Sequence, residues 1–195
     1  MSRSGRVERA TKETDVAVQV DLDGQGAYQL ATGIPFFDHM LSHIAKQGLL
    51  TLEVRARGDL EVDFHHTVED VGLAFGEAVA KALGDKVGIR RYGSASLPME
   101  EALAEVSVDL SGRPFFVYQV DIAPEKVGVF DVSLAKEFLR SFANRCGMNL
   151  HVNVPYGQDP HHVLEAIFKG FGLALGQAVT IDPRRHDVPS TKGTL

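Results

Sequence analysis

The chain has 195 residues, of which 44% are hydrophobic and 24% charged, and its formal net charge at pH 7 is −6. This length allows one well-buried core or two small halves that share one, and the negative charge argues against general nucleic-acid binding. The single cysteine, Cys146, excludes an intrachain disulfide framework and a cysteine-based zinc finger. The sequence contains no apolar run of the ~18 residues that suggest a membrane span, and residues 1–13 lack a signal-peptide core. We therefore expect a cytoplasmic protein with no membrane partner.

The first half of the chain predicts strands and helices in alternation. Alternating apolar residues over 15–22 and over 50–54 are typical of half-buried strands. Between them, residues 37–47 predict a helix that ends at Gly48. An Ala/Gly-rich apolar segment that starts at His65 predicts a second helix.

The second half predicts the same order of elements. Strands are expected over 105–110 and 114–120, followed by a helix over 133–145 that ends at Gly147, a strand over 148–154 and a helix from His161. Residues 88–96 are the expected junction. Neither half buries enough apolar surface alone, so we expect two sheets that cover a shared layer of helices.

Two copies of the pattern His-His-x-x-Glu begin at residues 65 and 161, which are 96 positions apart. Further identities at the same offset show that the copies belong to an internal duplication: Phe75 and Phe171, Gly76 and Gly172, Ala78 and Ala174, Ala82 and Ala178. On a helix, adjacent residues point about 100° apart, whereas residues three or four apart share a face. Each pair of histidines is therefore expected to divide between two metals, with the glutamate joining one of them.

The remaining histidines do not follow the duplication. His39 and His151 are further candidate ligands, but His151 aligns with Leu52, so the ligand set is only partly symmetric. His43, one helical turn after His39, could be a ligand, a substrate contact or a solvated residue, and we favour substrate contact. Imidazole and carboxylate without thiolate suit manganese, iron, cobalt, nickel or zinc, and the spacing alone does not choose among them.

Several runs resemble the signature sequences of imidazoleglycerol-phosphate dehydratases, enzymes of histidine biosynthesis. They are RATKET (9–14), FDHML (37–41), GDLEVDFHHTVED (58–70), DLSGRP (109–114), HHVLEA (161–166) and PSTKG (189–193). The resemblance extends over essentially the whole chain and leaves no room for an additional phosphatase domain, so it implies the monofunctional form.

The resemblance implies an α+β fold of two β-α-β-α halves, with the helices sandwiched between two mixed β-sheets, as in ribosomal protein S5 domain 2-like folds. The expected single domain, 1–195, consists of pseudo-repeats over about 6–90 and 97–185 and a substrate-contacting tail, 186–195. The resemblance also implies a cytoplasmic homo-oligomer of trimers that assemble into a 24-mer, with metal sites at subunit interfaces. Two Mn²⁺ ions are implied per active site, with these ligands: His39, His65, His66, Glu69, His151, His161, His162 and Glu165.

By the same resemblance, the substrate is imidazoleglycerol phosphate and the product imidazoleacetol phosphate. The expected route passes through an imidazolate held by two metals and a diazafulvene, with Glu13 or Glu165 as the acid/base group. The implied substrate contacts are Glu13, His43, Arg91, Arg113, Lys169, Ser190 and Lys192. Because Ser190 and Lys192 lie in the tail, we expect the tail to order over the phosphate. From the residues alone, a surface glutamate in a polar N-terminal arm is the favoured interpretation of Glu13.

Two other functions are consistent with the duplicated motif. A dinuclear hydrolase would activate water between two cations and would lack a site for an imidazole. A metal-storage protein would bind the ions without catalysis, and the cationic residues Arg113 and Lys192 argue against it.

Overall fold

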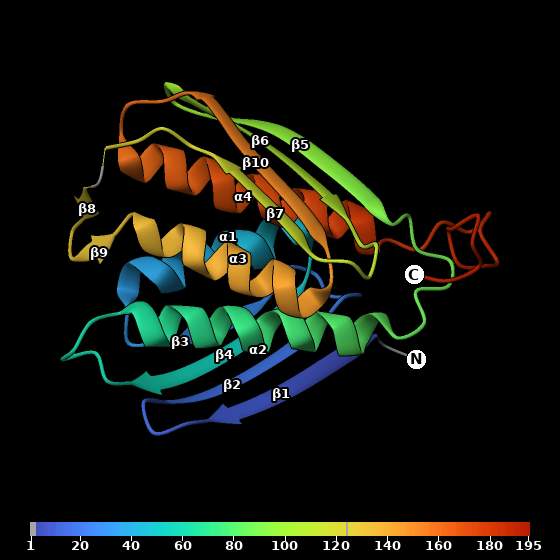
Figure 1. Ribbon diagram of the computed structural model, residues 1–195, viewed down its shortest axis with the longest axis horizontal. Helices are drawn as coiled ribbons and strands as arrows, with labels where there is room; N and C mark the ends of the chain where they lie inside the picture. Colours follow the sequence, from blue (N-terminus) through green and yellow to red (C-terminus); the bar gives the residue numbers. More distant parts are fainter. Residues whose placement is uncertain (1–2, 124) are drawn as a thin grey trace.

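The computed structural model describes residues 3–123 and 125–195 and shows two sheets with helices between them (Figure 1). The first sheet has the order β1-β2-β4-β3 and consists of β1 (Ser4–Ala10), β2 (Thr14–Asp21), β3 (Tyr28–Ala31) and β4 (Thr51–Gly58). β1, β2 and β4 pair antiparallel, and β3 runs parallel to β4. The inward residues of β2 are Thr14 and three valines while its other side chains are more exposed, which is the alternation of a strand with one buried face.

The second sheet repeats this arrangement with the order β5-β6-β10-β7. Its strands are β5 (Tyr92–Met99), β6 (Ala102–Asp109), β7 (Phe115–Gln119) and β10 (Asn149–Tyr156), and a short hairpin of β8 (Lys126–Val127) and β9 (Phe130–Asp131) follows β7. β10 pairs antiparallel with β6 and parallel with β7, as β4 does with β2 and β3. The predicted fold class is confirmed, although each half carries three strands of its four-stranded sheet before its first helix.

Four helices fill the space between the sheets: α1 (Pro35–Gly48), α2 (His65–Leu83), α3 (Ser133–Cys146) and α4 (Pro160–Val179). α2 packs on β1 and β2, and α4 packs on β5 and β6. Across the middle, α3 contacts α2 and α1 contacts α4. The helices of the two halves therefore share one core.

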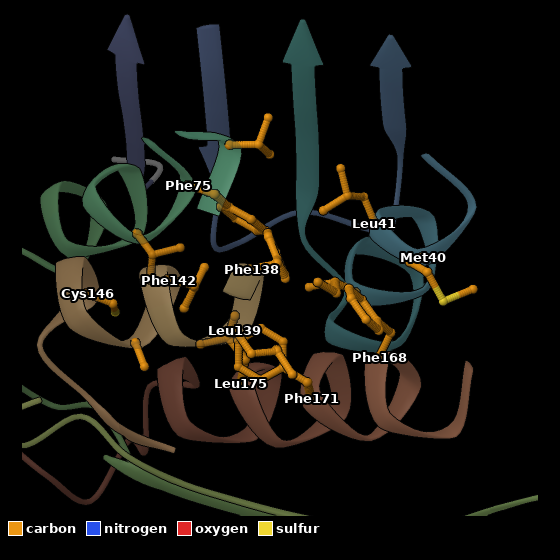
Figure 2. Close-up of a cluster of buried hydrophobic side chains, with 14 of the residues drawn as sticks. Met40, Leu41, Phe75, Phe138, Leu139, Phe142, Cys146, Phe168, Phe171 and Leu175 are labelled. Atoms are coloured by element: carbon orange, nitrogen blue, oxygen red, sulfur yellow. The ribbon is translucent and has the colours of Figure 1, made fainter. Parts of the chain in front are cut away.

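Aromatic side chains at duplicated positions join the two halves (Figure 2). The ring of Phe142 on α3 lies 4.9 Å from Phe75 on α2 and 5.1 Å from Phe171 on α4, both in edge-to-face contact. All three side chains are fully buried, and each contributes about 1.5–3 kcal/mol through burial of apolar surface. Because Phe142 lies between its two partners, α3 separates α2 from α4 and thus separates the two His-His-x-x-Glu motifs.

Glycines allow each outer strand to approach its helix closely. A Cβ atom at Gly5 would lie 2.0 Å from the carbonyl oxygen of Ala78, and one at Gly93 would lie 1.9 Å from that of Ala174. Ala78 and Ala174 are themselves a duplicated pair, so the same close packing holds both motif-bearing helices on their sheets.

The structure corrects several sequence-based expectations. The sequence pattern did not predict β1, β3 or β5, and β5 begins inside the expected junction. Gly48 is the last residue of α1, and the left-handed residue that caps the helix is Leu49 (φ 54°) rather than the expected Gly48. Gly147 is confirmed as the left-handed residue that ends α3 (φ 70°). In the parts of the chain that the structure describes, none of the helices combines the length and the apolar character needed to cross a membrane.

Candidate metal centre and anion pocket

The second motif begins helix α4, where Asp159 and Pro160 determine the start. The Asp159 carboxylate accepts a hydrogen bond from the His161 backbone N–H at 2.8 Å, and proline occupies the first helical position. One turn later, Glu165 Oε2 lies 3.1 Å from His161 Nε2. The local sequence thus places the imidazole and the carboxylate on one helix face, as their spacing predicted.

Helix α1 adds two histidines to this face. Glu165 lies 3.3 Å from His39 Nε2 and 3.5 Å from His43 Nε2, and the two imidazole nitrogens are 3.3 Å apart. Within residues 3–123 and 125–195, these three side chains form the one group of three or more ligand-type residues whose donor atoms lie within 4.8 Å of one another. Nitrogen and carboxylate donors converging from two helices match the ligand preferences of divalent transition metals.

The charge states of this group suit metal binding. Burial lowers the pKa of His43 to about 4, which keeps its imidazole neutral and its ring nitrogen free to coordinate near neutral pH. Burial also acts to raise the pKa of Glu165, but the hydrogen bond from Lys169, at 2.6 Å, and the nearby histidines lower that pKa to about 2. Glu165 is therefore an anion that is only 7% exposed. His43, for which the sequence favoured substrate contact, lies in this ligand-type group.

The first motif, at the start of α2, is more open. His65 Nε2 lies 3.6 Å from Glu69 Oε2, and the two side chains are 42% and 38% exposed. His66 Nδ1 contacts Asp59 at 3.0 Å and lies 3.9 Å from the carboxylate of Glu13. The structure thus places Glu13, in the turn between β1 and β2, beside this motif rather than in an unstructured arm.

The second histidine of each motif contacts a carboxylate outside the motif. His162 Nδ1 lies 2.7 Å from Glu101 Oε2, as His66 Nδ1 lies 3.0 Å from Asp59. These hydrogen bonds raise the pKa of both histidines. Hydrogen bonds from backbone N–H groups, that of Asp159 first, and from His162 lower the pKa of Glu101 to about 2.

Of the remaining predicted ligands, His151 lies apart from the three-residue group. It is exposed on β10, and its ring centroid is 6.4 Å from that of Phe115. Within one chain, the structure therefore brings together His39, His161 and Glu165 of the predicted ligands. His65, His66 and Glu69 lie together elsewhere, and His162 is turned toward Glu101.

Four of the predicted substrate contacts line one pocket of about 580 Å³: Arg91, Arg113, Ser190 and Lys192. Arg185 also lines it and was not predicted, and Asp187 is the one acidic side chain among the lining residues. The Arg91 guanidinium donates to Asp109 at 2.6 and 3.1 Å and to the carbonyl of Pro189 at 2.8 Å, which fixes the tail against the sheet. The pocket has an excess of cationic side chains, which suits a phosphate.

Lys169, predicted with this set, lies elsewhere. Its ammonium contacts Glu165 at 2.6 Å and Met99 Sδ at 3.5 Å. The pocket adjoins the opposite end of α4, because the Arg91 backbone N–H donates to the carbonyl of Ala178. From His161 to Ala178 the helix rises roughly 25 Å. Figure 1 shows the tail at the far end of the molecule from the start of α4.

The sequence did not identify Arg185, Asp59 or Glu101 as functional residues. Arg185 is in the basic pair of the tail, and that pair was the one available signal. Asp59 lies within a family-like run but has no metal-ligand spacing to the motif. Glu101 gave no signal, because only the turn between β5 and β6 brings it to α4.

Comparisons with known proteins identify the family of this chain. The family model described as imidazoleglycerol-phosphate dehydratase matches residues 32–175. Imidazoleglycerol-phosphate dehydratases from Alkaliphilus metalliredigens and Trichlorobacter lovleyi are 56% and 53% identical over 195 residues, with both chains fully covered. The crystal structure of the enzyme from Pyrococcus furiosus in complex with (S)-C348 superposes with a TM-score of 0.84 at 36% identity, covering 97% of this chain and 100% of that chain. The chain therefore belongs to the imidazoleglycerol-phosphate dehydratase family, the hydro-lyases that act on imidazoleglycerol phosphate in histidine biosynthesis.

Proposed function

We propose that this dehydratase is manganese-dependent and binds two Mn²⁺ ions per active site. The observation that carries the proposal is the convergence of His39, His43 and Glu165 at the start of α4, next to His161. The eight residues predicted as ligands remain the proposed set, and His43 joins them as a candidate. Bound Mn²⁺ would supply positive charge that lets the substrate's imidazole lose its N–H proton near neutral pH.

We further propose that each active site is shared between copies of the chain. Because α3 lies between α2 and α4, the two motifs of one chain face different surroundings. The cationic pocket lined by Arg113 and Lys192 lies roughly 25 Å from His161 along α4. This distance is longer than one imidazoleglycerol phosphate molecule. Residues from different copies would bring motif and pocket together, which supports a homo-oligomer. We propose that it consists of trimers assembled into the expected 24-mer.

The reaction must remove a hydroxyl and a weakly acidic hydrogen from adjacent carbons. We propose that the electron-rich ring of the substrate expels the neighbouring hydroxyl, which takes a proton from the protonated acid/base carboxyl group and leaves as water, and that the ring becomes a diazafulvene. In that intermediate the adjacent C–H bond is acidic, and a carboxylate can take its proton to give the enol, which tautomerises to the ketone.

Glu13 is our candidate for the proton transfer, with Glu165 as the alternative. The Glu13 side chain is 57% exposed, and its nearest ion pair with a described residue is with His66 at 3.9 Å. Its carboxylate is therefore accessible to a substrate. Glu165 is buried and bound to Lys169, which better suits a ligand that holds its place.

The phosphate is proposed to bind in the cationic pocket. Arg113 and Lys192 would supply the charge, because Arg91 is already paired with Asp109. Ser190 adds a hydroxyl, and the tail would close over the phosphate. Lys169 would reach a phosphate only if the pocket comes from another copy. Since the family acts in histidine biosynthesis, we expect the enzyme to work in the cytoplasm.

The test is dehydration of imidazoleglycerol phosphate by metal-stripped protein before and after addition of Mn²⁺. We expect activity only after the addition, and no activity in either case would overturn the proposal. Triazole compounds should inhibit, since they resemble the substrate ring, and a hydrolase would respond much less. Native mass spectrometry tests the assembly.

A further inference from the structure

Both motifs show the same division of roles between their two histidines. The first histidine turns Nε2 toward the glutamate four residues later, at 3.6 Å for His65 and 3.1 Å for His161. The second histidine turns Nδ1 toward a carboxylate that is not part of the motif. The ring planes of the adjacent histidines cross at 87° and 68°, so the two imidazoles in each motif point to different places.

The two outside carboxylates come from unrelated positions in the chain. Asp59 is seven residues before His66, in the loop between β4 and α2, whereas Glu101 is 61 residues before His162, in the turn between β5 and β6. Glu101 occupies the turn between β5 and β6 as Glu13 occupies the turn between β1 and β2, and the same offset relates Gly93 to Gly5. The Glu13 carboxylate lies 3.9 Å from His66 Nδ1, but the carboxylate nearest to that nitrogen is Asp59, from the loop before α2. The two halves therefore use different carboxylates beside their second histidines.

A carboxylate beside Nδ1 defines what the histidine can do with its other nitrogen. An ionised carboxylate only accepts hydrogen bonds, so Nδ1 must carry the proton and Nε2 keeps its lone pair. In metal sites such an arrangement fixes the tautomer and the orientation of the ring, and its loss commonly weakens metal binding 10- to 100-fold.

We propose that Asp59 and Glu101 are positioning residues that hold His66 and His162 with Nε2 free and aimed at the metal. This inference rests on the proposed function, because it takes both histidines as metal ligands. It assigns a purpose to two acidic residues that belong to neither motif and do not touch the three-residue group around Glu165.

Glu101 also has a structural contact that the test must separate from this role. Its Oε1 atom accepts hydrogen bonds from the backbone N–H groups of Gln158 at 3.2 Å and Asp159 at 2.8 Å, just before α4. Oε2 faces His162. In Glu101→Gln, the amide oxygen can keep the two backbone contacts while the amide NH₂ donates to His162 Nδ1. The proton then moves to Nε2, where it blocks coordination, although the loop remains anchored.

The experiment measures Mn²⁺ binding to the metal-stripped protein by the EPR signal of free Mn²⁺, together with the melting temperature without metal. For Glu101→Gln we expect at least one class of sites to bind 10- to 100-fold more weakly, with a melting temperature within about 2 °C of the unmutated protein. Glu100→Gln is the matched control, since it removes a neighbouring exposed charge that makes no described hydrogen bond to His162, and it should bind normally.

Asp59 provides an independent variant, because its carboxylate makes hydrogen bonds to His66 alone among the described contacts. Asp59→Asn should weaken binding less than Glu101→Gln, since Glu13 lies 3.9 Å from the same nitrogen and can partly replace the acceptor. Asp59→Glu, which keeps a carboxylate, should restore affinity to within about threefold, well inside the 10- to 100-fold loss of such contacts. Glu61→Gln, an exposed neighbour, is its control.

The outcomes separate this inference from the proposed function. If the unmutated protein binds no Mn²⁺, the proposed function fails. If it binds Mn²⁺ and both Glu101→Gln and Asp59→Asn bind equally well, only the positioning role is wrong. A lower melting temperature in Glu101→Gln with normal affinity in Asp59→Asn would show that these carboxylates act on the fold.

Discussion

The two His-His-x-x-Glu motifs share their spacing and helical position but have different surroundings. At the start of α4, the Glu165 side chain is 9% exposed and lies between histidines of two helices. At the start of α2, Glu69 is 38% exposed and its described ion pair is with His65 alone. The duplication thus supplied two similar helices, but it completed a three-ligand group at only one of them.

The helix that packs against each motif-bearing helix explains the difference. α1 and α3 are both 14 residues long, and their fifth and ninth positions are His39 and His43 in α1 but Glu137 and Ser141 in α3. Glu137 is paired with Arg140 on its own helix. The α2 motif therefore receives no imidazole from its neighbouring helix, and we infer that its ligand set is completed by another copy.

The largest expected effect comes from removing one histidine of either motif. We expect His161→Ala and His65→Ala each to lower kcat/KM by about 10³-fold or more, since a bound metal contributes several kcal/mol to catalysis. Steady-state kinetics with saturating Mn²⁺ measures this, and metal-free melting curves serve as the control for folding. Substantial activity in His65→Ala would show that the open motif is dispensable.

Mixing these two inactive variants tests whether the motifs act within one chain or between chains. If each site combines the α2 motif of one copy with the α4 motif of another, about a quarter of the sites in a randomly mixed symmetric assembly are intact. We therefore expect activity to return after the two variants are dissociated together and reassembled. Continued inactivity, with native mass spectrometry showing mixed assemblies, would place both motifs in a single-chain site.

The cationic pocket should affect substrate affinity more than turnover. We expect Lys192→Ala and Arg113→Ala to raise KM about 10- to 100-fold with a smaller change in kcat, because charge-assisted contacts to a phosphate act on binding in the ground state as well as in the transition state. Arg184→Ala is the control, since this exposed tail residue pairs with Asp182 and does not line the pocket. Equal losses in kcat would show that these residues act on the reacting atoms.

Repeats and spacing in the sequence predicted much of this arrangement. The two motifs, the helices that carry them and the layered fold followed from the offset of 96 and from the apolar pattern. β1 was not predicted, because its seven residues include three charged ones, Arg6 and Glu8 on the solvated face and Arg9, which pairs with Asp70. The pairing of Glu101 with His162 depends on a turn 61 residues away, which no local pattern encodes.

The predicted substrate contacts lie in two places in the structure, which the sequence did not predict. Family resemblance grouped Lys169 with Arg91, Arg113, Ser190 and Lys192, and four of these five line one pocket. Lys169 instead contacts Glu165, because it is one turn further along α4 and both side chains lie on the same helix face. The assembly determines which copy supplies each residue to a shared site. No pattern in the sequence of one chain predicts this.

The smallest expected effect concerns the stability of the metal-free protein, whose dependence on pH should differ between the surroundings of the two motifs. The pKa of His43 is about 4 in the folded state against an ordinary value of 6.5, because burial disfavours its charged form. The unfolded chain therefore binds the proton first as the pH falls from 6.5 to 4, and the free energy of unfolding should decrease by about 1 kcal/mol in that window, after allowance for solvent screening.

His66 should act in the opposite direction. The hydrogen bond to Asp59 raises its pKa, so its contribution to stability is present below pH 6.5 and is lost as the pH rises through the folded-state pKa. Urea unfolding between pH 4.5 and 7.5, at one protein concentration, should show a weaker acid destabilisation in His43→Asn and a stronger one in Asp59→Asn. If both variants changed the acid destabilisation in the same direction, burial would not explain a difference in pH dependence between the two motifs. The distinction between a closed and an open half-site would then be wrong.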